Sequence, residues 1–336
     1  MYRSFFGLRE RPFDLTPNPR FLVLTAAHKE ALSSLEYGIA SRRGITALIG
    51  EAGTGKTTLI RSALERQSQQ VHCVYLHNPS LTRAEFVEML ALHFHLSPEA
   101  GLSKTALLTE LEATLRSRHQ RGESSVLVVD EAQSLPLELL EEIRLLGNIE
   151  TDETKLLSIV LAGQPELATR LNQDSLRQLK QRIALRCELR PLEQAETAAY
   201  LAGRLRAAGG VGAQIFTREA VMMIHERSAG VPRTASVIAD NALLTAFALG
   251  QKPINSLVIA EVCRDLDLKP AKLAVSETDL AEAALKPRED GSVRSSRVLS
   301  FEPGEPDAGV KKGNTATEPE AKQGLFYRMG RRFSIF

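Results

Sequence analysis

The sequence contains no tryptophan, only three cysteines among 336 residues, and few aromatic residues. Cys73, Cys187 and Cys263 lie far apart, so their spacing excludes a disulfide framework and a cysteine-rich zinc site. No run of about 18 apolar residues occurs, which predicts that the chain has no transmembrane helix. The opening stretch MYRSFFGLRERPF lacks the apolar core of a signal peptide. With a formal net charge of +1, the total charge does not require a nucleic-acid partner, and a cytoplasmic protein is expected.

Apolar segments of strand length alternate with helical patterns over the first part of the chain. The expected strands are Ile45–Gly50, Val71–His77, Ser125–Asp130, Leu156–Ala162 and Ala184–Leu189. The helical patterns between them are Lys56–Arg66, Arg83–Phe94, Lys104–His119, Leu137–Ile149 and Pro165–Leu171. This alternation predicts an α/β fold with a doubly wound parallel sheet of five strands.

The strand signals stop after about Pro191, and helical patterns follow. They cover Glu193–Ala208, Thr217–Ala229, Pro232–Leu249 and Ser256–Leu266. From about Lys269 onward Ser, Glu, Pro, Gly and Lys dominate, which predicts a segment that buries too little apolar surface to fold. The predicted parts are an N-terminal segment over 1–44, an α/β core over 45–191, a small helical domain over 192–268, a disordered linker over 269–323 and a C-terminal segment over 324–336.

The stretch GEAGTGKTT carries the strongest signal in the chain. It fits the pattern G-x-x-x-x-G-K-[ST] and lies between an expected strand and an expected helix. Its glycines allow backbone N–H groups to point inward around phosphate oxygens, and the helix start adds a positive dipole end. Lys56 is expected on the β- and γ-phosphates, and the Thr57 hydroxyl on Mg²⁺. The residues expected to bind ATP here are Gly50, Glu51, Ala52, Gly53, Thr54, Gly55, Lys56, Thr57 and Thr58.

Two adjacent carboxylates follow the apolar run Val126–Val129. A buried charge is unfavourable without a partner, and a magnesium ion is one such partner. Asp130 is therefore expected to bind the ATP complex and to hold Mg²⁺ together with Thr57. Glu131 is expected to polarise the water that attacks the γ-phosphate. The alternative is a solvent-exposed helix start, where acidic residues are favourable, but the phosphate loop upstream favours the metal site.

Three further residues are candidates for the catalytic site. Gln164 follows the fourth expected strand, which should lie between the first and the third and bring its amide near the γ-phosphate. Arg182 belongs to a basic segment at the sheet edge and is the chosen arginine finger for a neighbouring subunit, with Arg177 and Arg186 as alternatives. Arg233, next to a proline that suits a first helical turn, is expected to reach the γ-phosphate from the helical domain. The alternatives are a turn residue, a solvated basic helix face and a surface arginine, respectively.

Together these motifs resemble the AAA+ superfamily. The resemblance implies Walker A at Gly50–Thr57, Walker B at Val126–Glu131, sensor 1 at Gln164, an arginine finger near Arg182 and sensor 2 at Arg233. The chain would then be an ATP hydrolase that forms a homo-oligomer, since an arginine finger acts across an interface.

The first forty residues resemble the start of the ExeA-type ATPases, also called general secretion pathway protein A. The matching groups are Phe6-Gly7-Leu8, Pro12-Phe13, Thr16-Pro17 and a helix that contains His28-Lys29-Glu30-Ala31-Leu32. The segments DEAQSL and LAGQPEL also match sequences of that family. The resemblance spans about Met1–Leu266. It implies that the N-terminal segment packs beside the adenine.

The resemblance also suggests what the ATPase serves. ExeA-type secretion proteins carry a membrane span after the ATPase region and then a peptidoglycan-binding module, and neither is expected in this chain. This pattern fits the shorter soluble relatives that are encoded with exosortase, polysaccharide-export or pilus systems. An ATPase that assembles or regulates a cell-envelope secretion, polysaccharide-export or pilus system is the favoured function. A DNA-binding regulator of the transposition type and a nucleotide switch that recruits a partner are the alternatives. Nucleic acid is the less favoured partner because no strong basic-aromatic patch is present.

The last residues, Gly324–Phe336, combine aromatic, apolar and basic groups again. Such groups at the tip of a flexible tail predict a docking peptide for a partner protein or for the anionic inner leaflet of a membrane. A tail end that packs on its own ATPase domain and a chance composition are the alternatives. The expected location is the cytoplasm, with peripheral contact at the inner membrane.

Overall fold

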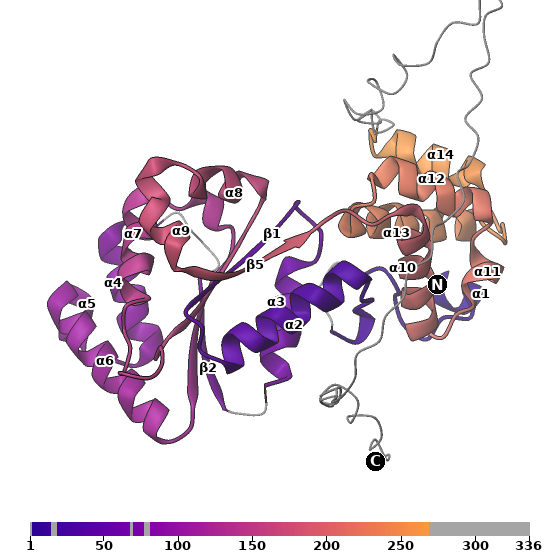
Figure 1. Ribbon diagram of the computed structural model, residues 1–336. Coiled ribbons are helices and arrows are strands. Elements are labelled where there is room, and N and C mark those ends of the chain that lie inside the picture. The colour runs from indigo at the N-terminus through magenta and orange to yellow at the C-terminus, as the bar shows by residue number, and fades with distance from the viewer. Residues whose placement is uncertain (1, 15–18, 68–69, 77–80, 269–336) are drawn as a thin grey trace, which may run out of the picture. The chain divides into compact units, whose positions relative to one another are not determined.

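The structure, a computed structural model, describes residues 2–14, 19–67, 70–76 and 81–268 (Figure 1). All of these residues fall within one compact unit, Met1–Ala274. The linker and the C-terminal segment expected over 269–323 and 324–336 lie outside the described residues. Within the described part, no helix combines the length and the apolar character that a membrane span requires.

A parallel sheet of five strands forms the centre of the α/β part, in the order β2-β3-β4-β1-β5. The strands are β1 (Ile45–Gly50), β2 (Val71–Leu76), β3 (Ser124–Val129), β4 (Ser158–Gly163) and β5 (Ile183–Leu189). The predicted α/β doubly wound fold is confirmed, and β4 lies between β1 and β3 as expected. Because the strands are parallel, the segments that follow β1, β3 and β4 meet at one edge of the sheet.

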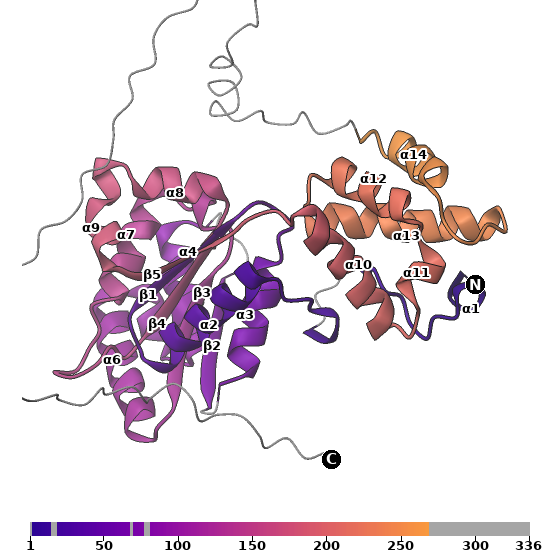
Figure 2. The same cartoon turned by 45° about the vertical axis from the view of Figure 1, so that its right-hand side comes forward.

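Helices cover both faces of the sheet, which explains why the central strands are apolar on both sides (Figures 1 and 2). One face packs on α2 (Ala26–Ala40) and α3 (Lys56–Glu65), with Val126 and Val128 of β3 in that core. The other face buries Leu127 and Val129 under a second set of helices. That set comprises α4 (Arg83–Phe94), α5 (Pro98–Leu102), α6 (Lys104–Gln120), α7 (Leu137–Leu146), α8 (Pro165–Leu171) and α9 (Arg177–Arg182).

A second hydrophobic core lies within the helical part of the chain. Its helices are α10 (Gln194–Ala207), α11 (Gly212–Ile215), α12 (Arg218–Ser228), α13 (Pro232–Ala248) and α14 (Ser256–Asp265). The N-terminal segment contributes five buried side chains to this core, two of them from α1 (Tyr2–Phe6) and one from the 3-10 turn η1 (Pro19–Phe21). These side chains are Tyr2, Phe6, Leu8, Phe13 and Phe21. The segment over 1–44 therefore contacts both parts of the chain. Its helix α2 packs on the sheet, and the residues before α2 pack on the helical part.

Local differences from the predicted elements have simple causes. The helix expected over Leu137–Ile149 ends at Leu146. The short helices α5, α9 and α11 were not predicted, because hydrophobic periodicity needs a window of about 11 residues to be recognised. The strand expected to reach His77 is described as far as Leu76, and His77 lies outside the described residues.

Candidate nucleotide site

The loop Gly50–Thr58 connects the end of β1 to the start of α3 and folds around its own lysine. The Lys56 ammonium donates hydrogen bonds to the carbonyl oxygens of Gly50, at 2.7 Å, and Glu51, at 3.1 Å. The Thr54 hydroxyl donates to the Glu51 carbonyl at 2.8 Å. The loop thus has the strand–loop–helix context in which backbone N–H groups and a helix N-terminus bind phosphate.

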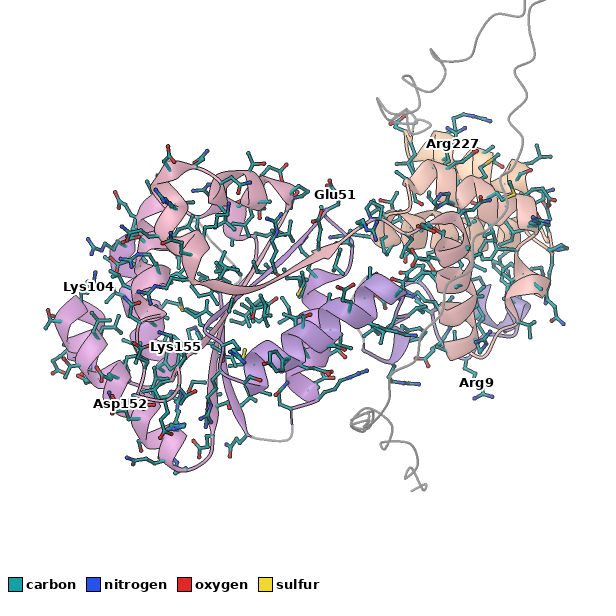
Figure 3. All side chains as sticks on the ribbon, in the orientation of Figure 1. Arg9, Glu51, Lys104, Asp152, Lys155 and Arg227 are labelled. Carbon is teal, nitrogen blue, oxygen red and sulfur yellow. The ribbon has the colours of Figure 1, made fainter. Side chains whose placement is uncertain are left out.

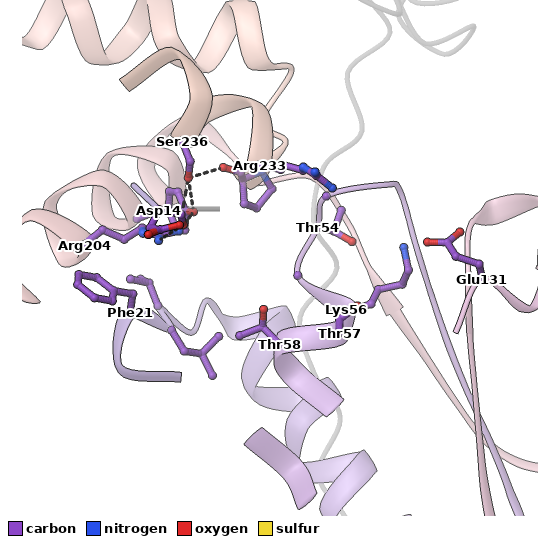
Figure 4. A pocket seen from close by; sticks show the side chains of 16 residues that line it. Asp14, Phe21, Thr54, Lys56, Thr57, Thr58, Glu131, Arg204, Arg233 and Ser236 are labelled. Atoms are coloured by element: carbon purple, nitrogen blue, oxygen red, sulfur yellow. Dashed lines mark hydrogen bonds between the residues drawn. The ribbon is translucent and has the colours of Figure 1, made fainter. Parts of the chain in front are cut away.

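The start of α13 contacts this loop at Gly53. The backbone N–H of Arg233 donates to the Gly53 carbonyl at 3.1 Å. Gly53 has a φ of +83°, and a Cβ added there would lie 2.7 Å from the Cβ of Arg233. Only glycine fits this backbone conformation and this close approach. Pro232 occupies the first turn of α13 as predicted, and the Arg233 side chain lines the cleft next to the loop (Figure 4).

Asp130 follows β3 and accepts hydrogen bonds on both carboxylate oxygens. The hydroxyls of Thr57 and Tyr75 each donate to Oδ2 at 2.8 Å, and the N–H of Glu131 donates to Oδ1 at 3.0 Å. Burial raises the pKa of Tyr75, as do the charge of Asp130 and the hydrogen bond to it, so the phenol stays a donor. Among the described residues no cluster of three or more His, Cys, Asp or Glu could hold a metal by itself. The Thr57–Asp130 oxygen pair instead fits an ion such as Mg²⁺, which prefers oxygen ligands and keeps bound water or phosphate.

Glu131 faces the loop lysine and is held by two glutamines. Its backbone is left-handed, with φ +52° and ψ +38°, a strained conformation for a residue with a side chain. Gln133 and Gln164 each donate through Nε2 to Glu131 Oε2, at 2.6 and 3.0 Å. Burial alone would raise the pKa of Glu131, but these hydrogen bonds and the charge of Lys56 outweigh it and lower the pKa. Figure 4 shows the Lys56 and Glu131 side chains pointing toward one another.

A cleft of about 400 Å³ extends from the loop toward the helical part (Figure 4). Phe21, Leu22 and Val23 of the N-terminal segment line it opposite the loop, together with Arg204 of α10. The Arg204 guanidinium lies 5.5 Å from the Phe21 ring centre and donates to the Pro12 carbonyl at 2.6 Å. The volume suits a small organic ligand. The resemblance placed the adenine beside this segment, and that placement stays a prediction.

His28 connects α2 to the phosphate loop, a role that the sequence did not indicate. Its Nε2 lies 3.1 Å from the Thr54 carbonyl oxygen, and its Nδ1 lies 2.8 Å from the Thr25 hydroxyl. Because a carbonyl only accepts, the Nε2 atom carries the proton of that contact and donates to the Thr54 carbonyl. His28 is buried, with a relative exposure of 5%, so the ring is fixed between α2 and the loop.

Arg182 lies away from this cluster, at the other end of the sheet. It ends α9, and the next residue, Ile183, pairs with Ile45 at the start of β1. The loop follows the far end of β1, about 20 Å away at roughly 3.3 Å per residue, which exceeds the reach of an arginine side chain. In Figure 3, the label of Glu51 marks the end of the sheet that carries the loop, and the label of Lys155 marks the opposite end. Within its own chain, Arg182 therefore cannot contact a nucleotide on the loop.

The predicted residues thus fall into four groups. Gly53 to Thr58, Glu131 and Arg233 line the cleft, and Asp130 and Gln164 contact residues that line it. The loop residues Gly50, Glu51 and Ala52 do not line it, although two of them hold Lys56 through their carbonyl oxygens. The arginines considered as fingers, Arg177, Arg182 and Arg186, are exposed and lie outside the cleft.

Known proteins share parts of this sequence and of this fold. A protein-family profile described as an AAA domain matches residues 39–171. Over 254 residues the chain is 43% identical to general secretion pathway protein A of Aeromonas hydrophila, covering 76% of this chain and 46% of that protein. It is 26% identical over 186 residues to the Mu-like prophage FluMu DNA transposition protein B of Haemophilus influenzae, covering 54% of this chain and 60% of that protein. The chain therefore spans only about half the length of the relatives that it matches.

Two solved structures share the fold. The Aeropyrum pernix ORC2 protein, solved in ADPNP–ADP complexes, has a TM-score of 0.58 at 17% identity, covering 82% of this chain and 75% of that chain. Cdc6p from Pyrobaculum aerophilum has a TM-score of 0.58 at 19% identity, covering 80% and 73%. At such low identity the likeness concerns the fold alone.

The parallel sheet, the phosphate loop and the carboxylates after β3 form a P-loop fold of the AAA+ type, and residues 39–171 match the AAA domain profile. The chain resembles general secretion pathway protein A, which confirms the resemblance inferred from the sequence.

Proposed function

We propose that the chain binds ATP with Mg²⁺, hydrolyses it, and uses this cycle to assemble or regulate a cell-envelope secretion, polysaccharide-export or pilus system. The observation that carries the enzymatic part is the position of Glu131. Its carboxylate faces Lys56 in the cleft and is oriented by Gln164 at the tip of β4. A carboxylate held next to the γ-phosphate lysine is placed to act on a water molecule beside that phosphate.

Each residue of the cluster then has a distinct task. Lys56 and the loop N–H groups would bind the phosphates, and the oxygens of Thr57 and Asp130 would hold Mg²⁺, which when bound would supply positive charge next to the phosphate oxygens. Glu131 accepts the proton of the attacking water. Arg233 brings a positive charge from the helical part, since its backbone already touches Gly53.

The test of hydrolysis is the variant Glu131→Gln. The amide cannot accept the proton, so turnover should fall about 10²-fold or more while ATP affinity stays near that of the wild type. Glu138→Gln, an exposed acid at the start of α7, is the matched control and should leave turnover unchanged. Phosphate release and calorimetric titration measure the two quantities. A Glu131→Gln protein with normal turnover removes the proposed base, and a wild type without turnover favours the nucleotide switch.

One observation supports a second function, a DNA-binding regulator of the transposition type. The chain is 26% identical over 54% of its length to a protein named as a DNA transposition protein. The identity to the secretion pathway protein is higher and covers more of this chain, so the envelope function is preferred. Turnover measured with and without duplex DNA separates the two, because a DNA-binding regulator should be stimulated and an envelope ATPase should not.

The partners follow from the same proposal. We expect a homo-oligomer, because Arg182 can reach a bound nucleotide only from a second copy. The direct partners would be envelope secretion or export components on the cytoplasmic side, with the C-terminal segment as a peripheral contact to the inner membrane.

A further inference from the structure

The 3-10 turn η2 (Ala132–Ser134) places the side chain of Gln133 between two residues of the candidate site. The amide Nε2 donates to Glu131 Oε2 at 2.6 Å. The amide oxygen, Oε1, accepts from the backbone N–H of Gln164 at 3.0 Å. Gln133 therefore uses its donor and its acceptor at once, each on a residue already implicated in hydrolysis.

These contacts close a three-membered ring. Gln164 donates its own Nε2 to the same Glu131 oxygen at 3.0 Å, so Glu131, Gln133 and Gln164 hold one another. A closed ring of hydrogen bonds restricts each side chain more than a single contact does. Both donors reach the same carboxylate oxygen, Oε2.

The surrounding structure is built to admit the Gln133 amide. Gly163 ends β4, and a Cβ added there would lie 2.9 Å from Gln133 Oε1 and 2.7 Å from Leu167 Cδ2. No larger residue fits without displacing this contact. Arg170 of α8 donates to the backbone carbonyl oxygens of Gln133 and, at 2.7 Å, of Leu135, which fixes the turn itself.

We propose that Gln133 is a positioning residue for ATP hydrolysis: it holds the Glu131 carboxylate and couples its orientation to the tip of β4 through Gln164. The inference rests on the proposed function, since it assigns a part in the same reaction. Gln133 is not among the residues that line the cleft, so we expect it to act through Glu131.

A positioning role has a signature in the split between kcat and KM. Gln133 contacts Glu131 and Gln164 and is not among the residues that line the cleft, so its loss should lower kcat and leave KM for ATP near the wild-type value. A variant that disturbs the loop or the fold would change both quantities.

The decisive variant is Gln133→Glu. It keeps the size and the acceptor for the Gln164 N–H but replaces the donor with a carboxylate that repels Glu131. The kcat should fall about 10²-fold, as for a misplaced catalytic group, with KM for ATP within about twofold of the wild type. Ser134→Ala, an exposed position on the same turn, should change none of these values.

A second variant tests the contact without using turnover. The double variant Glu131→Gln/Gln133→Glu exchanges donor and acceptor, so the hydrogen bond forms again with reversed direction. Its thermal midpoint should recover from the lower value of Gln133→Glu, while hydrolysis stays absent because position 131 has no base. Failure of this recovery overturns the inference, and so does a Gln133→Glu protein with wild-type kcat. A wild type that never hydrolyses ATP instead refutes the proposed function, and the recovery still reports on the contact.

Discussion

Lys56 is buried between backbone carbonyls and two acids, which sets its electrostatic state. Burial lowers the pKa of its ammonium, and the nearby charges of Glu131 and Asp130 oppose that effect. The carboxylates therefore favour the charged ammonium against the effect of burial. The same charge is the one that a phosphate group would bind.

The variant Lys56→Ala should abolish tight ATP binding. A charge-assisted hydrogen bond to phosphate contributes about 1.5–3 kcal/mol or more, and the alanine removes it entirely. Calorimetric titration with Mg·ATP measures the change, and Lys29→Ala, on an exposed face of α2, is the matched control. Equal affinity of both variants would show that the loop is not the phosphate site.

At the scale of secondary-structure elements, two helices position the loop from outside the motif. α2 reaches it through His28, and α13 reaches it through the backbone of Arg233 on Gly53. α2 also packs on the sheet, whereas α13 belongs to the helical core. A change in the loop conformation on nucleotide binding would therefore alter the contacts of both helices.

Removal of the α2 contact is a second prediction. His28→Ala leaves the Thr54 carbonyl without its ring N–H donor, and a buried group left unpaired costs about 1–3 kcal/mol. We expect ATP affinity to fall about tenfold and the thermal midpoint to drop by a few degrees. His93→Ala, an exposed histidine on α4, should change neither quantity. Unchanged ATP affinity in His28→Ala would mean that the loop keeps its shape without α2.

At the scale of the whole molecule, the position of Arg182 requires a second copy for its proposed role. The side chain is exposed at the end of α9 and lies near Glu150. The pKa of Glu150 is lowered first by the hydrogen bond from Lys155 and to a smaller extent by the charge of Arg182. This exposed cation at the sheet edge could enter the cleft of a neighbouring subunit.

Turnover per subunit should then rise with protein concentration. Arg182→Ala should lower turnover with little loss of ATP binding, and mixing it with Lys56→Ala should partly restore activity, because each supplies what the other lacks. Arg177→Ala and Arg186→Ala in the same assay decide which arginine acts. Activity that is independent of concentration in a strictly monomeric sample would contradict the assignment.

The C-terminal segment, outside the described residues, gives the last prediction. A tether of about 55 residues would reach roughly 40 Å as a random coil, and each basic residue near an anionic surface contributes about 1 kcal/mol. Deletion of Gly324–Phe336 should preserve ATPase activity and reduce co-sedimentation with anionic liposomes. Loss of ATPase activity or solubility would instead assign the segment to the fold.

The sequence by itself determined the sheet, the phosphate loop and the carboxylates after β3. Each of these features depends on residues that are close together in the sequence. They are a glycine-lysine pattern after a strand, an apolar run before Asp130, and strands that alternate with helices. The position of Gln164 beside Glu131 was also accessible, because the order of strands in this fold class brings the ends of β3 and β4 together.

Only the tertiary structure decided which residues outside the motifs support the site. The side chains of Tyr75, His28 and Gln133 each contact a residue of the site. No pattern in the neighbouring sequence predicts these contacts. Likewise, the aromatic side chains of the N-terminal segment could be recognised as apolar, but their place in the helical core depends on partners about 200 residues away along the chain, such as Asp240, which accepts from the Tyr2 hydroxyl. Local periodicity specifies an element, whereas contacts between distant elements exist only once the chain has folded.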